Sequence, residues 1–234
     1  MRALTLLARA ISLATEQGDT YTEGWARAMV VYTHFISGAL DEAERSADTA
    51  IRIARREHND EAASFAILGS AFVSFQRGQP AAARALYAEA FALARSRDAA
   101  WPRCIALSGL CSVTVAAGDL AEARRLLEES LHDFAGNGFI PVDAIYGTIA
   151  LLLAREGERE RALRVFTAVR PGTEDNIGIN AHLADPTGAL RDATREARRL
   201  LGDPTPADPE TIDFASVMQA VLGAPRAGQP MTAA

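Results

Sequence analysis

The octad ISGALDEA at residues 36–43 decides the fold, because its pattern returns as QRGQPAAA at 76–83, AAGDLAEA at 116–123 and REGERERA at 155–162. In each octad a glycine is followed five residues later by an alanine, and successive glycines are 40, 40 and 39 residues apart. A fixed period of this length is typical of stacked helical repeats. Glycine accepts the left-handed backbone on which many helices end, and the small alanine, one turn into the next helix, lets two helices approach closely. The sequence therefore predicts an all-α fold, an α-solenoid of antiparallel helix pairs.

The composition is that of an ordinary soluble chain, with 49% apolar and 23% charged residues. Its net charge of -6 argues against direct nucleic-acid binding, which normally uses a basic face. No stretch approaches the roughly eighteen apolar residues of a membrane span, and the first residues lack the long apolar core of a secretory signal. We therefore expect a cytoplasmic protein that does not associate with membranes.

Residues that could carry catalysis are absent or unfavourably spaced. All 24 basic residues are arginine, and a chain without lysine has neither a Walker-type phosphate loop nor a Schiff-base amine. Carboxylate pairs such as Asp41/Glu42 and Glu128/Glu129 are typical of solvated helix faces. No serine lies in a strand–turn–helix nucleophile elbow. We therefore expect no enzyme activity and no cofactor.

The cysteines and histidines predict no metal site. Cys104 and Cys111 are seven residues apart, a helical rise of about 10 Å, which is too far for a disulfide within one helix. Buried reduced thiols are the expected state. The histidines show no ligand spacing among themselves or with the cysteines; they are His34, His58, His132 and His182.

Apolar periodicity and helix-breaking residues divide the chain. Residues 3–17 align with the second helix of the next repeat when shifted by 40 positions, so the chain begins with a half repeat at 1–19. Four repeats complete a repeat region over 1–169, near 21–58, 59–98, 99–138 and 140–169. Residues 170–223 are expected to form a loop followed by two C-terminal capping helices, at 189–201 and 210–222. Residues 224–234 are expected to be a disordered tail.

The glycine–alanine spacing resembles that of tetratricopeptide repeats. Small residues early in the second helix and seven residues later fit that family at Ala43/Ala50, Ala83/Ala90 and Ala123/Ser130, although the period is nearer 40 than about 34. This longer variant is similar to the helical-repeat region of large bacterial transcription regulators of the MalT/LuxR and SARP types. The similar stretches are GDLAEARRLLEESLHDFAGNGF, YGTIALLLAREGERERALRVF, TREARRLLGD and ETIDFASVMQAVLG. The resemblance covers about residues 1–223.

In those regulators the repeat region senses a small molecule or a protein. The resemblance therefore implies a non-enzymatic binding module that takes a peptide, a protein or a small apolar ligand on the concave face lined by first helices. The initial half repeat favours a fragment of such a regulator. Two alternatives stay open: an enzyme or biosynthetic accessory protein with a helical-repeat pocket, and a structural dimerisation module.

Six aromatic residues stand out on the first helices. Trp25, Tyr32 and Phe35 recur 40 residues later as Phe65, Phe72 and Phe75. Spacings of seven and three keep each triplet on one helix face, so the two triplets are expected to lie side by side. In one interpretation they line a ligand groove, with His34 and Gln76 as polar contacts and at least three rings partly exposed. In the other they pack as core between repeats, as aromatic stripes at helical spacing usually do.

The half repeat leaves an apolar face on residues 3–17. Its members are Leu6, Leu7, Ala10, Leu13 and Ala14. An exposed face of this kind is commonly covered by a partner. We expect the chain to form a homodimer through it.

Overall fold

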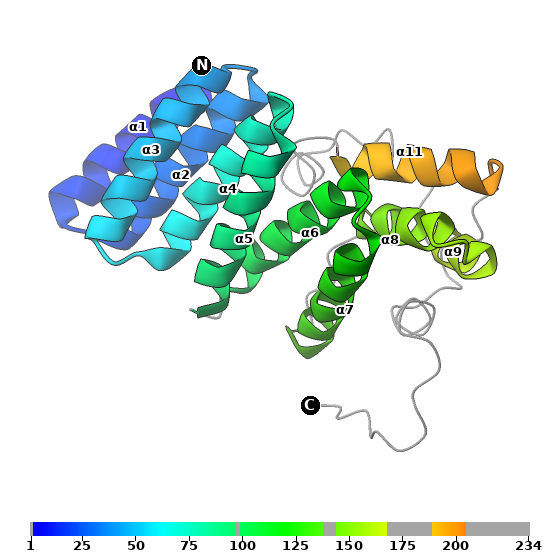
Figure 1. The fold of residues 1–234 in the computed structure, drawn as a ribbon. Helices are drawn as coiled ribbons and strands as arrows, with labels where there is room; N and C mark the ends of the chain where they lie inside the picture. The colour runs from blue at the N-terminus through cyan, green and yellow to red at the C-terminus, as the bar shows by residue number, and fades with distance from the viewer. Residues whose placement is uncertain (1, 97–98, 138–143, 168–188, 205–234) are drawn as a thin grey trace. The chain divides into compact units, whose positions relative to one another are not determined.

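The computed structural model describes residues 2–96, 99–137, 144–167 and 189–204, which are helical apart from short turns (Figure 1). No strand occurs in these residues, and the predicted all-α class is confirmed. The helices are α1 (Arg2–Gln17), α2 (Thr20–Ile36), α3 (Leu40–Arg56), α4 (Asp60–Gln76), α5 (Pro80–Ser96), α6 (Ala100–Ala117), α7 (Leu120–Asn137), α8 (Ala144–Arg155), α9 (Arg159–Phe166) and α11 (Ala189–Leu201).

The glycine of each octad ends a first helix with the same pair of hydrogen bonds. After α2, the Gly38 N–H donates to the Phe35 carbonyl and the Ala39 N–H to the His34 carbonyl, both at 3.0 Å. This pattern is the Schellman motif, which needs a residue with left-handed backbone. At all four octad glycines φ lies between +69° and +82°, and none of them is inside a helix, as predicted.

The second helix of repeat one ends with the same geometry but without glycine. His58 takes the left-handed position with φ of 54°, and the Asn59 N–H donates to the Ala54 carbonyl at 2.8 Å. Left-handed backbone costs a residue with a side chain about 1–2 kcal/mol. Asn59 then begins the next helix, because its side chain accepts the Ala62 N–H at 3.0 Å.

Successive helices pack against their neighbours, as in an all-α helical-repeat solenoid. α2 contacts α1, α3 and α4, while α4 also contacts α3 and α5. The alanine of each octad is 0% exposed, at Ala43, Ala83, Ala123 and Ala162. Where α4 meets α2, a Cβ added to Gly69 would lie 2.4 Å from Val31 Cγ1. Small residues therefore allow the helices to approach closely, as the alanine of each octad predicts.

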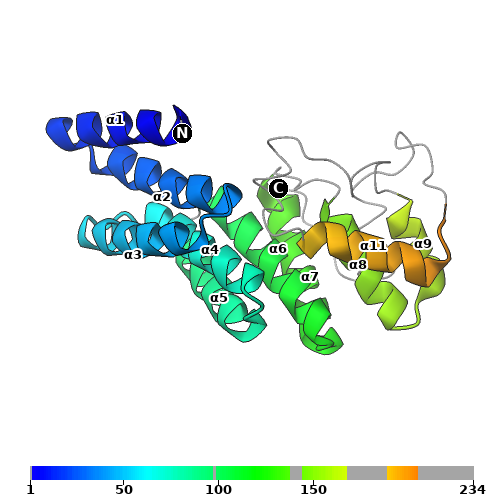
Figure 2. The ribbon, with the colours of Figure 1, turned by 90° about the horizontal axis from the view of Figure 1, so that it is seen from above.

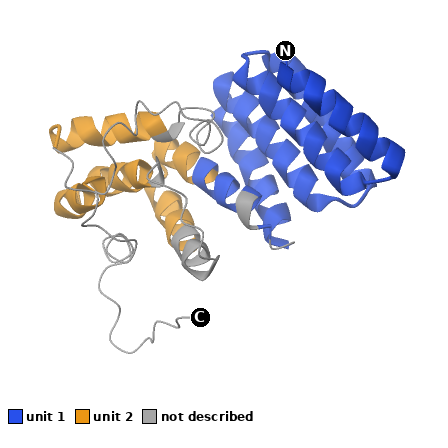
Figure 3. Cartoon of the chain, turned by 180° about the vertical axis from the view of Figure 1, so that it is seen from behind, with its two compact units in different colours: residues 1–109 blue, residues 110–234 orange. Residues whose placement is uncertain are grey.

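The chain divides into two compact units, residues 1–109 and 110–234 (Figure 3). In the first unit, α1 lies beside α2 and forms the end of the array (Figure 2). In the second unit, α11 packs against α8 and α9, and the Arg159 guanidinium donates to the Leu200 carbonyl at 3.0 Å at the end of α11. α11 coincides with the first predicted capping helix, whereas the predicted loop at 170–187, the helix at 210–222 and the tail lie outside the described residues.

Ion pairs join the second helix of one repeat to the end of the following first helix, and their signs reverse along the chain. Glu44 on α3 accepts a hydrogen bond at 2.7 Å from Arg77, which follows α4. Two repeats later, Arg124 on α7 donates at 2.9 Å to Glu156, which follows α8. The Arg124 and Glu156 side chains are both partly buried, and the glutamate raises the pKa of Arg124.

Two further expectations concern single helices. Cys104 and Cys111 on α6 are buried and are not joined in a disulfide, as predicted. None of the described helices combines the length and apolarity that crossing a membrane requires.

Candidate functional site

Five of the six predicted aromatic residues form a ring cluster between α2 and α4. The Trp25 and Phe65 ring centroids are 4.8 Å apart, and Tyr32 stacks on Phe65 at 4.6 Å. Phe72 meets Tyr32 edge to face at 5.4 Å and Phe35 at 5.8 Å. Such arrangements stabilise aromatic pairs beyond the effect of area burial alone. The cluster thus joins the first helices of repeats one and two.

Most of the rings are core rather than surface. Tyr32, Phe35, Phe65 and Phe72 are buried, whereas Trp25 and Phe75 are partly exposed. The groove interpretation expected at least three partly exposed rings, and the structure has two, because the others fill the space between α2 and α4. Gln76 is exposed at the end of α4. A role for these residues in contacting a ligand stays a prediction.

Two polar atoms of the ring cluster are enclosed with it. The Tyr32 hydroxyl and the Trp25 indole nitrogen are buried and have no hydrogen-bond partner among the described residues. Burial raises the pKa of Tyr32 well above its ordinary value. The cluster therefore contributes packing and not acid–base chemistry.

His34 lies on the opposite face of α2 from Trp25, because the two are nine residues, or about two and a half turns, apart. There it lines an open cleft of about 300 Å³ in the first unit. α2 supplies Arg27 and Val30 beside it, and α1 supplies Ile11. The rest of the lining comes from α3, with Glu42, Arg45, Ser46, Thr49 and Ala50. We call this feature the charged cleft.

The α2–α3 hairpin explains which residues face one another in the charged cleft. Its two antiparallel helices turn at Gly38, so positions equally distant from that glycine lie at the same height. His34 is level with Glu42 near the turn, Val30 with Ser46 further along, and Arg27 with Thr49 at the far end. The cleft therefore has polar side chains at both ends and Val30 between them, and Ile11 and Ala50 add further apolar lining.

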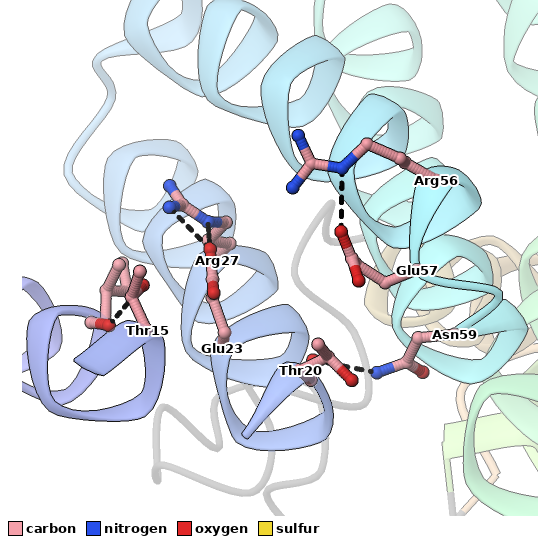
Figure 4. A network of polar contacts seen from close by, with 8 residues as sticks. Thr15, Thr20, Glu23, Arg27, Arg56, Glu57 and Asn59 are labelled. Carbon is pink, nitrogen blue, oxygen red and sulfur yellow. Dashed lines mark hydrogen bonds and ion pairs between the residues drawn. The ribbon is translucent and has the colours of Figure 1, made fainter. Parts of the chain in front are cut away.

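Arg27 is fixed in place by Glu23, one turn earlier on α2 (Figure 4). Its Nη2 and Nε atoms donate to Glu23 Oε1 at 2.7 and 2.9 Å. These hydrogen bonds lower the pKa of Glu23, against the opposite effect of desolvation. Both side chains are largely buried, with exposed fractions of 25% for Arg27 and 14% for Glu23. The remaining nitrogen of Arg27, Nη1, makes no hydrogen bond to the described part of the chain.

Hydrogen-bond donors on the walls of the charged cleft are only partly used by the protein. Arg45 Nη2 donates to Glu42 Oε1 at 3.0 Å on the exposed side of α3. Within the described residues, Arg45 Nε and Nη1 and the His34 ring nitrogens make no hydrogen bond. Each arginine of the lining is paired with a glutamate, Arg27 with Glu23 and Arg45 with Glu42, so these four side chains carry no net charge. What the cleft offers a ligand is therefore hydrogen bonding by the remaining donors.

The equivalent positions in repeat two carry no basic residue. Residues Arg27, His34, Glu42 and Arg45 correspond, 40 positions later, to Ile67, Ser74, Ala82 and Ala85. Ile67 is 1% exposed, and Ala63, which corresponds to Glu23, is 0% exposed. Repeat two therefore forms without these charges, whereas Glu42 and Arg45 recur in repeat three as Glu122 and Arg125, which form the same ion pair.

The groups of the charged cleft are guanidinium, imidazole, carboxylate and hydroxyl. Among the residues with described positions, no three histidine, cysteine, aspartate or glutamate side chains are placed to share a metal ion. Comparison with known proteins gives no match to a protein-family model or to a curated protein. What these groups offer together is hydrogen bonding and charge.

Sequence reasoning found only part of the charged cleft. It named His34, but as a neighbour of the rings, and it did not name Arg27 or Arg45. The alignment of repeats at 40 residues does show both arginines replaced by uncharged residues in repeat two. The same alignment also shows replaced charges at Asp48 and Arg52, which do not line the cleft. Only the fold selects the subset that meets in space.

Proposed function

We propose that the chain is a non-enzymatic helical-repeat binding module and that its ligand occupies the charged cleft. One observation carries the proposal: repeat one places Arg27, His34 and Arg45 around an open cleft where repeat two has uncharged residues. A stacked repeat does not need these charges for stability. In ligand pockets, a small number of polar groups in a concave site fixes the orientation of the ligand.

The proposed site differs from the groove predicted from the sequence. That groove was expected on the face lined by first helices, where four rings are now seen to be buried. The charged cleft lies on the other side of α2, between the second helices α1 and α3. Its volume of about 300 Å³ is at the lower end for ligand pockets, which favours a small molecule or the end of a peptide.

The biological setting we propose is regulatory. The resemblance of the octads and the closing stretches to the repeat regions of MalT/LuxR- and SARP-type regulators supports a sensing or protein-interaction part of a bacterial regulator. In that setting the cytoplasm is the compartment, and binding at the cleft is the signal that the module receives.

The test is a fragment screen on the isotope-labelled full chain, read by amide chemical shifts in NMR. The library contains acids, amines and neutral molecules. We expect some fragments to shift amides of α2 and α3 around Val30 and Ser46. A variant that copies repeat two removes the site, with Glu23→Ala, Arg27→Ile, His34→Ser, Glu42→Ala and Arg45→Ala.

We call this protein the repeat-copy variant, and its control is Ser70→Ala with Ser74→Ala, which changes the equivalent face of repeat two. The control should keep every fragment contact at the cleft, and the repeat-copy variant should lose them. If no fragment shifts the cleft amides, or if the repeat-copy variant binds as well as the natural chain, the proposed function is wrong.

A further inference from the structure

We infer that the outer face of α1 pairs with α1 of a second copy of the chain, antiparallel and about a two-fold axis. This face consists of five residues that are alternately three and four positions apart, the heptad spacing of paired helices. They are Ala3, Leu6, Ala10, Leu13 and Gln17. Ile11, which lines the charged cleft, is not one of them, so this surface is separate from the proposed ligand site.

The outer face of α1 is open to solvent. Leu6 is 61% exposed and Leu13 is 46% exposed, and Ala3 is also exposed. The other large apolar side chains that are exposed in the described part of the chain are Tyr21 and Ile36, both on the neighbouring helix α2. Exposed apolar residues are therefore gathered at one end of the array (Figure 2), as at surfaces that bind another protein.

The equivalent face of α3 shows that a helix can pack on this surface. Forty positions later the five residues are Ala43, Ser46, Ala50, Ile53 and Glu57. None of them is exposed, and the two alanines are 0% and 2% exposed, on a helix that contacts both α2 and α4. The same positions on α1 are therefore expected to accept a helix as well.

The order of residues on the outer face of α1 is self-complementary. In an antiparallel pair, the register that places Leu6 against the partner's Ala10 also places Leu13 against the partner's Ala3. By symmetry each alanine then meets a leucine of the partner. A large side chain opposite a small one lets two helices interdigitate closely. A second copy of α1 therefore fits this face without any rearrangement of its sequence.

Charged residues beside this face favour the antiparallel orientation. Arg2, Arg9 and Glu16 are exposed and seven residues apart, so they flank the apolar residues along one side. In the antiparallel pair, Arg2 lies next to the partner's Glu16, and Glu16 lies next to the partner's Arg2. In a parallel pair these flanks would lie on opposite sides and could not meet. Only Arg9 meets a like charge, the partner's Arg9 at the axis.

The experiment measures the dissociation constant of the dimer for the full chain by sedimentation equilibrium. Arg2→Glu or Glu16→Arg alone should weaken the dimer about ten-fold, because each change turns both opposite-charge pairs into like-charge pairs. Arg2→Glu with Glu16→Arg should restore the natural affinity. Arg9→Gln should tighten the dimer, because it removes the contact between like charges.

Unfolding of α1 would not explain weaker dimers in the single variants. A negative charge at the start of a helix and a positive charge at its end both suit the helix dipole. Arg52→Glu, at an exposed position of α3, changes the net charge as Arg2→Glu does and should leave the dissociation constant unchanged.

Three outcomes would overturn the inference. The first is a natural chain that stays monomeric at high concentration, and the second is a dimer on which the single charge reversals have no effect. The third is a double variant, Arg2→Glu with Glu16→Arg, that stays as weak as the single variants, because the antiparallel pair requires the two changes to compensate each other.

Discussion

Repeats one and two have the same helix–turn–helix backbone, but one face of the first helix carries different side chains in each. Both first helices end on a left-handed glycine, Gly38 and Gly78, and both second helices bury the alanine of the octad. Yet α2 carries the Glu23–Arg27 ion pair where α4 buries alanine and isoleucine. The position that holds a partly exposed arginine in repeat one, Arg27, holds a buried isoleucine in repeat two, Ile67.

The difference shows what determines whether a repeat position carries charge. A charged group needs solvent or a partner, because burial without either is costly. Beside α2, the cleft left by α1 and α3 provides solvent, and Glu23 provides the partner. Beside α4, the side chain of Ile67 is almost fully enclosed. Space at the end of the array, and not the repeat pattern, permits charged side chains at this position.

The largest loss of stability is expected when a charge is placed at the buried position of repeat two. We expect Ile67→Arg to lower the free energy of unfolding by about 3–5 kcal/mol, because the new charge is buried without a partner. The reverse change, Glu23→Ala with Arg27→Ile, should alter it by less than about 1 kcal/mol. Urea unfolding followed by circular dichroism measures both. Similar losses of unfolding free energy in Ile67→Arg and in Glu23→Ala with Arg27→Ile would show that the two helix faces tolerate charge equally.

The ring cluster offers the next largest effect. Phe72 is 2% exposed and contacts the rings of Tyr32 and Phe35 in repeat one and of Tyr87 in repeat two. Phe72→Ala should therefore cost about 3–5 kcal/mol, as for other large core truncations. Phe75→Ala is the matched control, since that ring is partly exposed and should cost clearly less. The comparison is made from urea midpoints. A loss for Phe75→Ala as large as for Phe72→Ala would contradict the assignment of these rings.

A smaller gain is expected at the end of α3, where repeat one uses His58 with left-handed backbone. His58→Gly removes the strain of the side chain and should stabilise the protein by about 1 kcal/mol. Gly78→Ala, which introduces that strain at the end of α4, is the opposite control and should destabilise. Thermal unfolding at neutral pH measures the two shifts. A lower melting temperature for His58→Gly would mean that the imidazole makes a stabilising contact.

The Glu23–Arg27 pair predicts a small dependence of stability on pH. Its hydrogen bonds hold the pKa of Glu23 below the ordinary value of 4.5, so their contribution is present above that pH. It is lost as the pH falls through the lower, folded-state pKa. Any stability advantage of the natural chain over Glu23→Ala with Arg27→Ile should therefore shrink between about pH 6 and pH 3. An advantage that grows on acidification would contradict the assigned pair.

The smallest effect on stability is expected for the exposed apolar face of α1. Leu6 and Leu13 are 61% and 46% exposed, while Ala14 is buried against the array. We propose that the two leucines contact a second copy of the chain. Leu6→Gln with Leu13→Gln should leave the melting temperature nearly unchanged but convert a dimer to a monomer in light scattering. Ser12→Gln, at another exposed position, is the control, and a natural chain that is monomeric at high concentration would remove this proposal.

The sequence alone predicted the helical class and the turns, because the signals at Gly38, Gly78, Gly118 and Gly157 are local. Residues close together in the sequence are enough to predict a left-handed helix end and a small residue one turn later. The charged cleft was not predictable in the same way. Its lining joins residues of three helices, and Arg27 differs from Arg52 only in where the fold places it.

The reversed ion pairs at the repeat junctions make the repeats non-interchangeable. If repeat one were followed directly by repeat four, Glu44 would face Glu156, and if repeat three preceded repeat two, Arg124 would face Arg77. Like charges brought together at an interface are costly. In repeat proteins, slipped or swapped pairing is a characteristic way to misfold. The signs of these four side chains therefore disfavour two wrong pairings, repeat one with repeat four and repeat three with repeat two.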